Sequence, residues 1–75
     1  MDKDILQFEI EKLVSANKTL CEEIMKIGEL EDLELLQDKL SETIHQLTFW
    51  VEQNNEDRFF YELKKYTEWV INNYS

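Results

Sequence analysis

The chain has little of what builds turns and cross-links. Its 75 residues include no proline, one glycine and one cysteine. A sheet protein needs turn residues every ~8–12 positions, and glycine and proline are the strongest of them. Their scarcity predicts an all-α protein. The lone Cys21 cannot close a disulfide within the chain, so the fold must be held by packing alone.

Long apolar runs are also missing. No stretch approaches the roughly 20 apolar residues that a membrane span requires. The first residues, Met1-Asp2-Lys3-Asp4, have neither the basic nor the apolar region of a signal peptide. Together with the single cysteine, these features predict a cytoplasmic protein that makes no use of a membrane.

Residues 1–75 are long enough for one helical domain. We expect helices at about 3–27, 32–53 and 56–74. Gly28 would end the first in a left-handed conformation, and Asp32 would cap the second. Asn54 and Asn55 would end the second and begin the third. Short links favour antiparallel neighbours, hence an up-down-up three-helix bundle. The alternative is a helical hairpin that completes a bundle by dimerisation.

Each segment carries an apolar stripe that would form the core. The first has Leu6, Ile10, Leu13, Asn17, Leu20, Ile24 and Ile27, widened by Val14 and Cys21. The second has Leu33, Leu36, Leu40, Ile44, Leu47 and Val51, flanked by Trp50. The third has Phe59, Phe60, Leu63, Tyr66, Thr67, Val70, Ile71 and Tyr74.

Asn17 is the polar member of a heptad seam, at an a position between Ile10 and Ile24. A buried asparagine needs a hydrogen-bond partner, and in coiled-coil dimers the partner is the same asparagine of the other chain. For Asn17 itself we favour a partner on another helix of the same bundle. The alternative is the same asparagine of a second chain, and the heptad seam around Asn17 favours a homodimer. Short chains also bury only about 60% of their unfolded surface, so self-association would add stability.

The net charge of −9 is concentrated in the middle of the chain. Residues 29–55 hold seven acids and one lysine, a net charge of −6. At about 100° per residue, four of the acids fall within an arc of about 80° opposite the leucine stripe. They are Glu31, Glu34, Asp38 and Glu42. Their rise of about 4.5–6 Å resembles the phosphate spacing of a duplex, which suggests nucleic-acid mimicry. The alternative is an ordinary solvated face, although no lysine follows at i+4.

Four aromatic residues fall outside the predicted core, namely Phe8, Phe49, Tyr61 and Trp69. Phe49 lies on the acidic arc, and an aromatic residue inside a polar rim is typical of an interface. The predicted partner-binding set is Glu31, Glu34, Leu35, Asp38, Glu42, His45 and Phe49. For Tyr61 and Trp69 we favour local packing with Lys65 between them.

Candidate chemistry is sparse. Glu42 and His45 form a Glu-x-x-His pair of the kind that binds metal in carboxylate-bridged bundles, but only one copy is present and it lies opposite the core stripe. Cys21 has no neighbouring cation to activate it. We therefore expect no catalytic, cofactor or metal site. The basic residues form no stripe, which disfavours direct binding to nucleic acid.

Acidic charge and helical fold favour a non-enzymatic protein-interaction module. The leading hypothesis is an inhibitor or regulator of a basic protein, such as a nuclease or another nucleic-acid-binding protein. Size and charge resemble those of small phage, antitoxin or immunity proteins. The alternative is a homo-oligomeric structural or chaperone-like bundle, whose outer aromatic residues would meet other copies.

Overall fold

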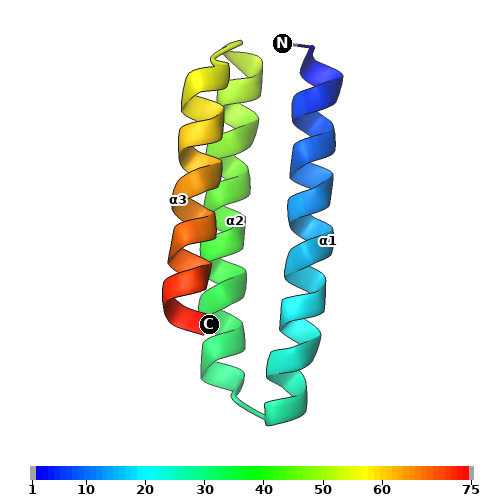
Figure 1. Cartoon of the computed structure of the whole chain (residues 1–75), viewed down its shortest axis with the longest axis vertical. Helices are drawn as coiled ribbons and strands as arrows, with labels where there is room; N and C mark the ends of the chain where they lie inside the picture. The colour runs from blue at the N-terminus through cyan, green and yellow to red at the C-terminus, as the bar shows by residue number, and fades with distance from the viewer. Residues whose placement is uncertain (1, 75) are drawn as a thin grey trace.

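Three antiparallel α-helices form the protein in a computed structural model that describes residues 2–74 (Figure 1). They are α1 (Lys3–Ile27), α2 (Leu30–Glu52) and α3 (Glu56–Tyr74). The chain runs along α1, returns along α2 and reverses again along α3, so α1 and α3 point the same way. No strand occurs among the described residues. The predicted all-α, up-down-up three-helix bundle is confirmed.

Gly28 ends α1 as predicted. Its φ of +84° lies in the left-handed region, and its N–H donates to the carbonyl oxygen of Ile24 at 3.0 Å. At the other end of the helix, Asp2 accepts a hydrogen bond from the Asp4 N–H at 3.1 Å. Both ends of α1 therefore have local hydrogen-bonding partners for the backbone groups that the helix leaves free.

The predicted start of α2 at Asp32 is wrong. The helix begins at Leu30, and Glu29 occupies the cap position without a capping bond from its side chain. The Glu29 carbonyl oxygen accepts from the Leu33 N–H at 3.2 Å, which sets the helical register ahead of Asp32. Asp32 instead lies in the first turn, where a carboxylate complements the helix dipole.

The two asparagines that separate α2 from α3 behave as predicted. Asn54 has a positive φ of 55°, a conformation that asparagine tolerates better than most residues. The Asn55 side-chain oxygen accepts from the Arg58 N–H at 3.1 Å and caps α3. Asn54 thus follows the C-cap of α2 in a left-handed conformation that stops the helix, and Asn55 caps the next helix.

We expect Gly28→Ala to destabilise the protein by about 1–2 kcal/mol, because an L side chain raises the energy of left-handed backbone by that amount. A Cβ built on Gly28 meets no atom within 4 Å, so the cost would come from the backbone alone. Urea unfolding followed by circular dichroism would measure it. Asn54→Gly is the control and should be neutral or stabilising, since glycine relieves the same conformation. An unchanged midpoint for Gly28→Ala would contradict the argument.

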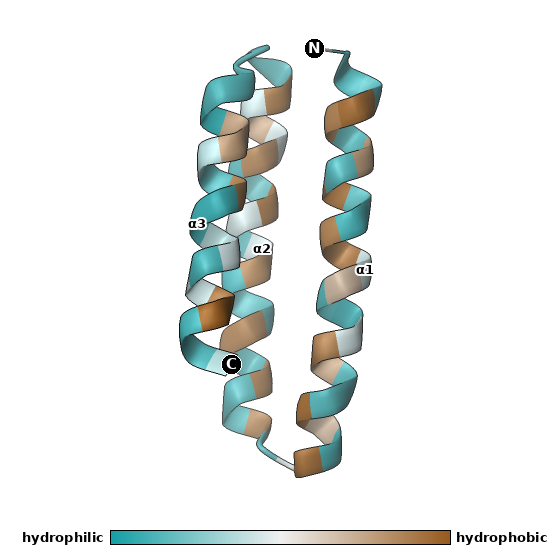
Figure 2. Cartoon of the chain, in the orientation of Figure 1, coloured by the Kyte–Doolittle hydropathy of each residue, from teal (hydrophilic) through white to brown (hydrophobic). Residues whose placement is uncertain are grey.

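The core consists of two clusters stacked along the bundle. The first contains Leu6, Ile10, Leu47 and Phe59, and the second contains Ile24, Leu36 and Tyr66. Half-buried side chains such as Leu13, Leu40, Leu63 and Val70 pack around them. Apolar residues follow the side of α1 that faces the other helices (Figure 2). Most of the predicted stripes therefore point inward.

Several predicted core positions are nevertheless wrong. The exposed ones are Val14, Ile27, Phe60, Thr67 and Ile71. The C-terminus of α3 lies short of the α1–α2 turn, so α3 leaves the end of α1 uncovered (Figure 1). Conversely, Thr43 and Trp69 were not expected in the core, yet Thr43 is buried and Trp69 packs against the second cluster. A narrow three-helix core buries only the centre of each stripe.

Candidate functional site

The outer face of α2 carries all seven residues predicted to bind a partner. Each of them is exposed, on the side of the helix opposite the buried Leu36, Thr43 and Leu47. We call this surface the acidic face and define it as Glu31, Glu34, Leu35, Asp38, Glu42, His45 and Phe49. Whether it binds a partner stays a prediction.

The four carboxylates of the acidic face form no ion pair with any residue from 2 to 74. Ion pairs occur instead within α1 and α3, as Glu9–Lys12 at 2.9 Å, Glu23–Lys26 at 3.4 Å and Lys64–Glu68 at 3.9 Å. Lys39, the one lysine of residues 29–55, lies 5.8 Å from the ring centroid of Trp69 on α3. Among residues 2–74, no lysine or arginine therefore pairs with the carboxylates of the acidic face.

Packing against Trp50 holds the ring of Phe49 in place. Its ring packs edge-on against Trp50 with 4.8 Å between centroids, and Trp50 packs against the first core cluster. Phe49 and His45 line a shallow hollow along α2 with four neighbours, Ser41, Ile44, Thr48 and Glu52. Phe49 is thus an exposed aromatic residue whose orientation the core helps to hold, which is how an interface anchor is presented.

The structure does not gather the whole acidic face into one patch. Leu35 and Phe49 are 14 residues apart on a continuous helix, a separation of about 21 Å. Phe49 therefore lies near Glu42 and His45, whereas Leu35 lies among Glu31, Glu34 and Asp38. The acidic face is a row along the helix, with one apolar residue near each end.

No other candidate metal-binding side chain joins Glu42 and His45 among the described residues. In the described part of the chain, no group of three or more His, Cys, Asp and Glu side chains is arranged to hold a metal ion. Both residues are exposed on a single helix. Their position is that of two members of the acidic face.

The other outer aromatic residues differ among themselves. Phe8 is exposed, with Lys12 Nζ 5.4 Å from its ring centroid. Tyr61 is exposed between Arg58 and Lys65, which lie 5.7 and 5.5 Å from its centroid. Trp69 was predicted to face away from the core, and this was wrong. It is half-buried, because it packs against the second core cluster and Lys39 of α2 lies over its ring. It also stacks against Tyr66 of its own helix.

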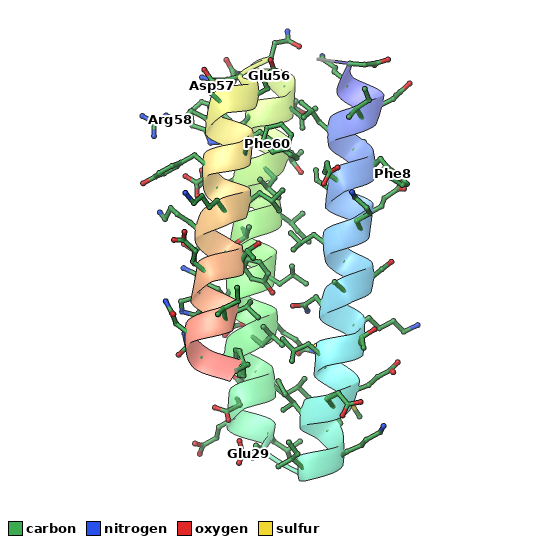
Figure 3. All side chains as sticks on the ribbon, viewed as in Figure 1. Phe8, Glu29, Glu56, Asp57, Arg58 and Phe60 are labelled. Atoms are coloured by element: carbon green, nitrogen blue, oxygen red, sulfur yellow. The ribbon has the colours of Figure 1, made fainter. Side chains whose placement is uncertain are left out.

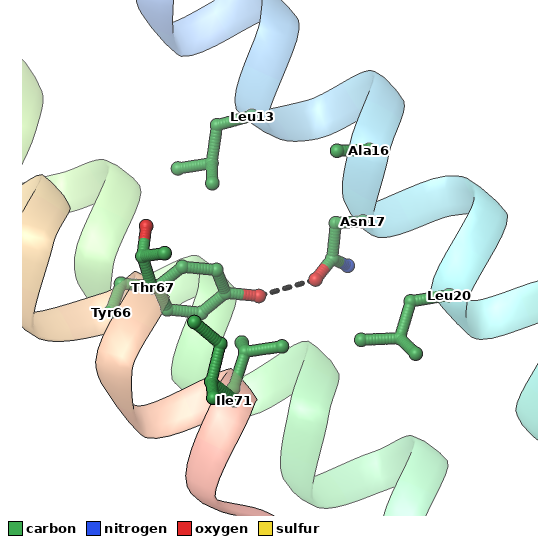
Figure 4. A pocket seen from close by; sticks show the side chains of 8 residues that line it. Leu13, Ala16, Asn17, Leu20, Tyr66, Thr67 and Ile71 are labelled. Atoms are coloured by element: carbon green, nitrogen blue, oxygen red, sulfur yellow. Dashed lines mark hydrogen bonds between the residues drawn. The ribbon is translucent and has the colours of Figure 1, made fainter. Parts of the chain in front are cut away.

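Asn17 is buried, and its partner lies within the same chain. The Tyr66 hydroxyl donates a hydrogen bond to Asn17 Oδ1 (Figure 4). Asn17 Nδ2 donates to Cys21 Sγ at 3.5 Å. The side chain is thus satisfied in the way that the intrachain alternative requires. A self-association role for Asn17 stays a prediction.

Burial is the main cause that raises the pKa of Tyr66 to about 12, with smaller contributions from Cys21 and Tyr74.

Sequence reasoning missed a groove between α1 and α3. It encloses about 170 Å³ above the Asn17–Tyr66 bond. Its walls are almost wholly apolar and comprise Leu13, Ala16, Leu20, Thr67, Val70 and Ile71. The pattern had placed most of these residues in a closed core. The signal that could have revealed the groove is the width of the third stripe, which is broader than two neighbouring helices can cover.

Comparisons of the chain with protein-family models, with curated proteins and with solved structures found no match. None of the helices described here has the length and apolar character needed to cross a membrane.

Proposed function

We propose that the protein is a non-enzymatic interaction module that inhibits or regulates a basic protein through the acidic face. The observation that carries the proposal is the row of four exposed carboxylates without cationic partners among residues 2–74. Isolated helices gain stability from Glu–Lys pairs at i+4, so an unpaired acidic row serves helix stability poorly. Its field would instead attract a cationic surface.

The partner class follows from the spacing and sign of these charges. Carboxylates that rise about 4.5–6 Å along a helix present acceptors at a pitch within a factor of two of the about 3.4 Å axial rise between phosphates of one duplex strand. A protein that binds nucleic acid through lysine and arginine would meet matching acceptors on α2. A nuclease or a repressor is such a protein, and occupation of its basic groove would block nucleic acid.

A comparison of two charge-reversed baits would test the partner class. Tagged wild-type protein and an Asp38→Lys/Glu42→Lys variant would be incubated with lysate of the native cell, and the retained proteins identified by mass spectrometry. Glu11→Lys/Glu22→Lys on exposed positions of α1 is the control with the same charge change. We expect a basic nucleic-acid-binding protein on the wild type and the control only. Equal retention by all three baits would contradict the proposal.

Kinetics with the retained protein should separate the roles of charge and aromatic contact. Asp38→Lys should mainly slow association, and the effect should shrink as salt rises, because exposed charges steer encounter over about a Debye length. Phe49→Ala should mainly speed dissociation, at a cost of about 2 kcal/mol or more. Surface plasmon resonance at two salt concentrations would measure both.

Phe8→Ala is the matched control for Phe49→Ala, because Phe8 is 57% exposed on α1 and Phe49 is 47% exposed on α2. We expect it to leave both rates unchanged. Circular-dichroism melts should show all of these variants folded, although loss of the Phe49–Trp50 contact should lower stability slightly. A large drop in melting temperature for Phe49→Ala would mean that Phe49 serves the fold and would remove the main apolar contact from the proposal.

A further inference from the structure

We infer that the α1–α3 side of the bundle is an interface for a second copy of this chain, so that the protein forms a two-fold dimer. This inference does not depend on the proposed function, because it concerns the opposite side of the molecule. It also differs from a dimer organised by Asn17, whose side chain already bonds to Tyr66.

The apolar groove between α1 and α3 offers a place for a side chain of a second copy. Tyr66 reaches from α3 to Asn17 on α1 and forms the floor, while Ala16 and Ile71 lie at opposite edges (Figure 4). Ala16 has no side chain beyond Cβ, which would allow the backbone of another helix to approach closely. A protruding apolar side chain from another helix would fill this space.

Helix α3 itself carries exposed apolar side chains of the kind that would fill this groove. Phe60, which lies on the side of α3 towards α1 (Figure 3), and Ile71 are exposed apolar residues, and Thr67 between them is also exposed. With Lys64 between them, these positions follow the 4-3-4 spacing of a heptad seam, which in coiled coils faces another helix. Within one chain, Thr67 and Ile71 border the groove with α1 on its other side, and their outer surface stays exposed. In a two-fold pair, the seam of each copy would enter the groove of the other.

The distribution of charge on the protein favours a second copy as the occupant of the groove. The segments containing α1 and α3 carry net charges of only −2 and −1 and hold three ion pairs, whereas residues 29–55 carry −6. Contact through the α1–α3 side would leave both acidic faces outermost. The bundle is 17 Å across its thinnest direction, so the acidic faces would be separated by about two such thicknesses. That exceeds the Debye length of about 8 Å at physiological salt, and repulsion between copies would be screened.

The available area is sufficient for a small dimer. Helix α3 has 19 residues and is therefore about 28 Å long. A face of that length and about the 18 Å width of the bundle covers roughly 500 Å² per copy, or about 1,000 Å² in total. This is near the lower limit for a specific interface. We therefore expect a dimer that dissociates on dilution.

Sedimentation equilibrium over a wide concentration range tests the inference. Wild-type protein should shift from one 9.1 kDa chain to the mass of a pair as concentration rises. Ile71→Glu should weaken the dimer by about 100-fold or more, because a charge enters a desolvated apolar contact and does so twice in a two-fold interface. Ala16→Glu, on the other wall of the groove, should have the same effect.

Leu35→Glu is the matched control, because Leu35 is 51% exposed and Ile71 is 55% exposed, and both changes add one negative charge. We expect Leu35→Glu to dimerise like the wild type. A wild type that stays a single chain at millimolar concentration would overturn the inference. So would a dimer that tolerates Ile71→Glu but dissociates with Leu35→Glu, since that dimer would use α2. Melts of each variant would establish that the chains remain folded.

Discussion

Phe59→Ala is expected to remove a large part of the protein's stability, whereas the same change at the next residue should be tolerated. Phe59 is 0% exposed and packs with Leu6, Ile10 and Leu47, while Phe60 is 37% exposed. Truncation of a buried phenylalanine to alanine costs about 3–5 kcal/mol. At about 0.05–0.15 kcal/mol per residue, a chain of this size has only about 4–11 kcal/mol of stability in total. Phe59→Ala therefore removes a large part of it.

Urea unfolding followed by circular dichroism would compare the two alanine variants at equal protein concentration. If Phe59→Ala has no measurable transition, Phe59→Leu provides one, because leucine keeps much of the apolar volume. We expect a cost below that of the alanine variant but above that of Phe60→Ala. Equal losses for Phe59→Ala and Phe60→Ala would contradict the assignment of the core.

Tyr66→Phe is expected to cost about 1–3 kcal/mol at neutral pH, although it removes only one oxygen atom. The change would leave Asn17 Oδ1 buried without its tyrosine donor. A buried polar group that loses its partner bears its full desolvation cost. Asn17→Leu/Tyr66→Phe removes both partners and should be more stable than the sum of the two single changes predicts. Additive losses across this double-mutant cycle would show that the two side chains are not coupled.

The same pair predicts a loss of stability in strong alkali. Burial raises the pKa of Tyr66 from its ordinary value of 10 to about 12. Between these values the unfolded chain has released the Tyr66 proton and the folded protein still binds it, so the free energy of unfolding decreases as pH rises. The stabilisation is fully present below pH 10 and is lost by about pH 12. The difference amounts to at most about 3 kcal/mol.

Comparison of wild type with Tyr66→Phe isolates this effect, because lysine titration in the same range is common to both proteins. The difference in their unfolding free energies should shrink between pH 10 and 12. A difference that stays constant across this range would show that Tyr66 titrates alike in the folded and unfolded chains.

Local signals in the sequence were sufficient for most of the fold. Gly28 and Asn55 act within one or two turns of their own helices, so their roles can be predicted without knowledge of any distant residue. The start of α2 was placed two residues late, because Glu29 takes the cap position without a recognisable capping side chain. The exposure of the acidic face also followed from sequence, since helical periodicity places Asp38 and Glu42 opposite Leu36 and Leu47.

Only the tertiary structure decided how far each apolar stripe is covered. Periodicity gives the direction of a side chain from its own axis, but coverage depends on the distance and length of neighbouring helices. Ile71 and Trp69 lie on opposite flanks of α3, and the close packing of α3 on α2 half-buries Trp69 while the groove beside α1 leaves Ile71 exposed. The Asn17–Tyr66 bond joins residues 49 positions apart, a distance in sequence that no local pattern spans.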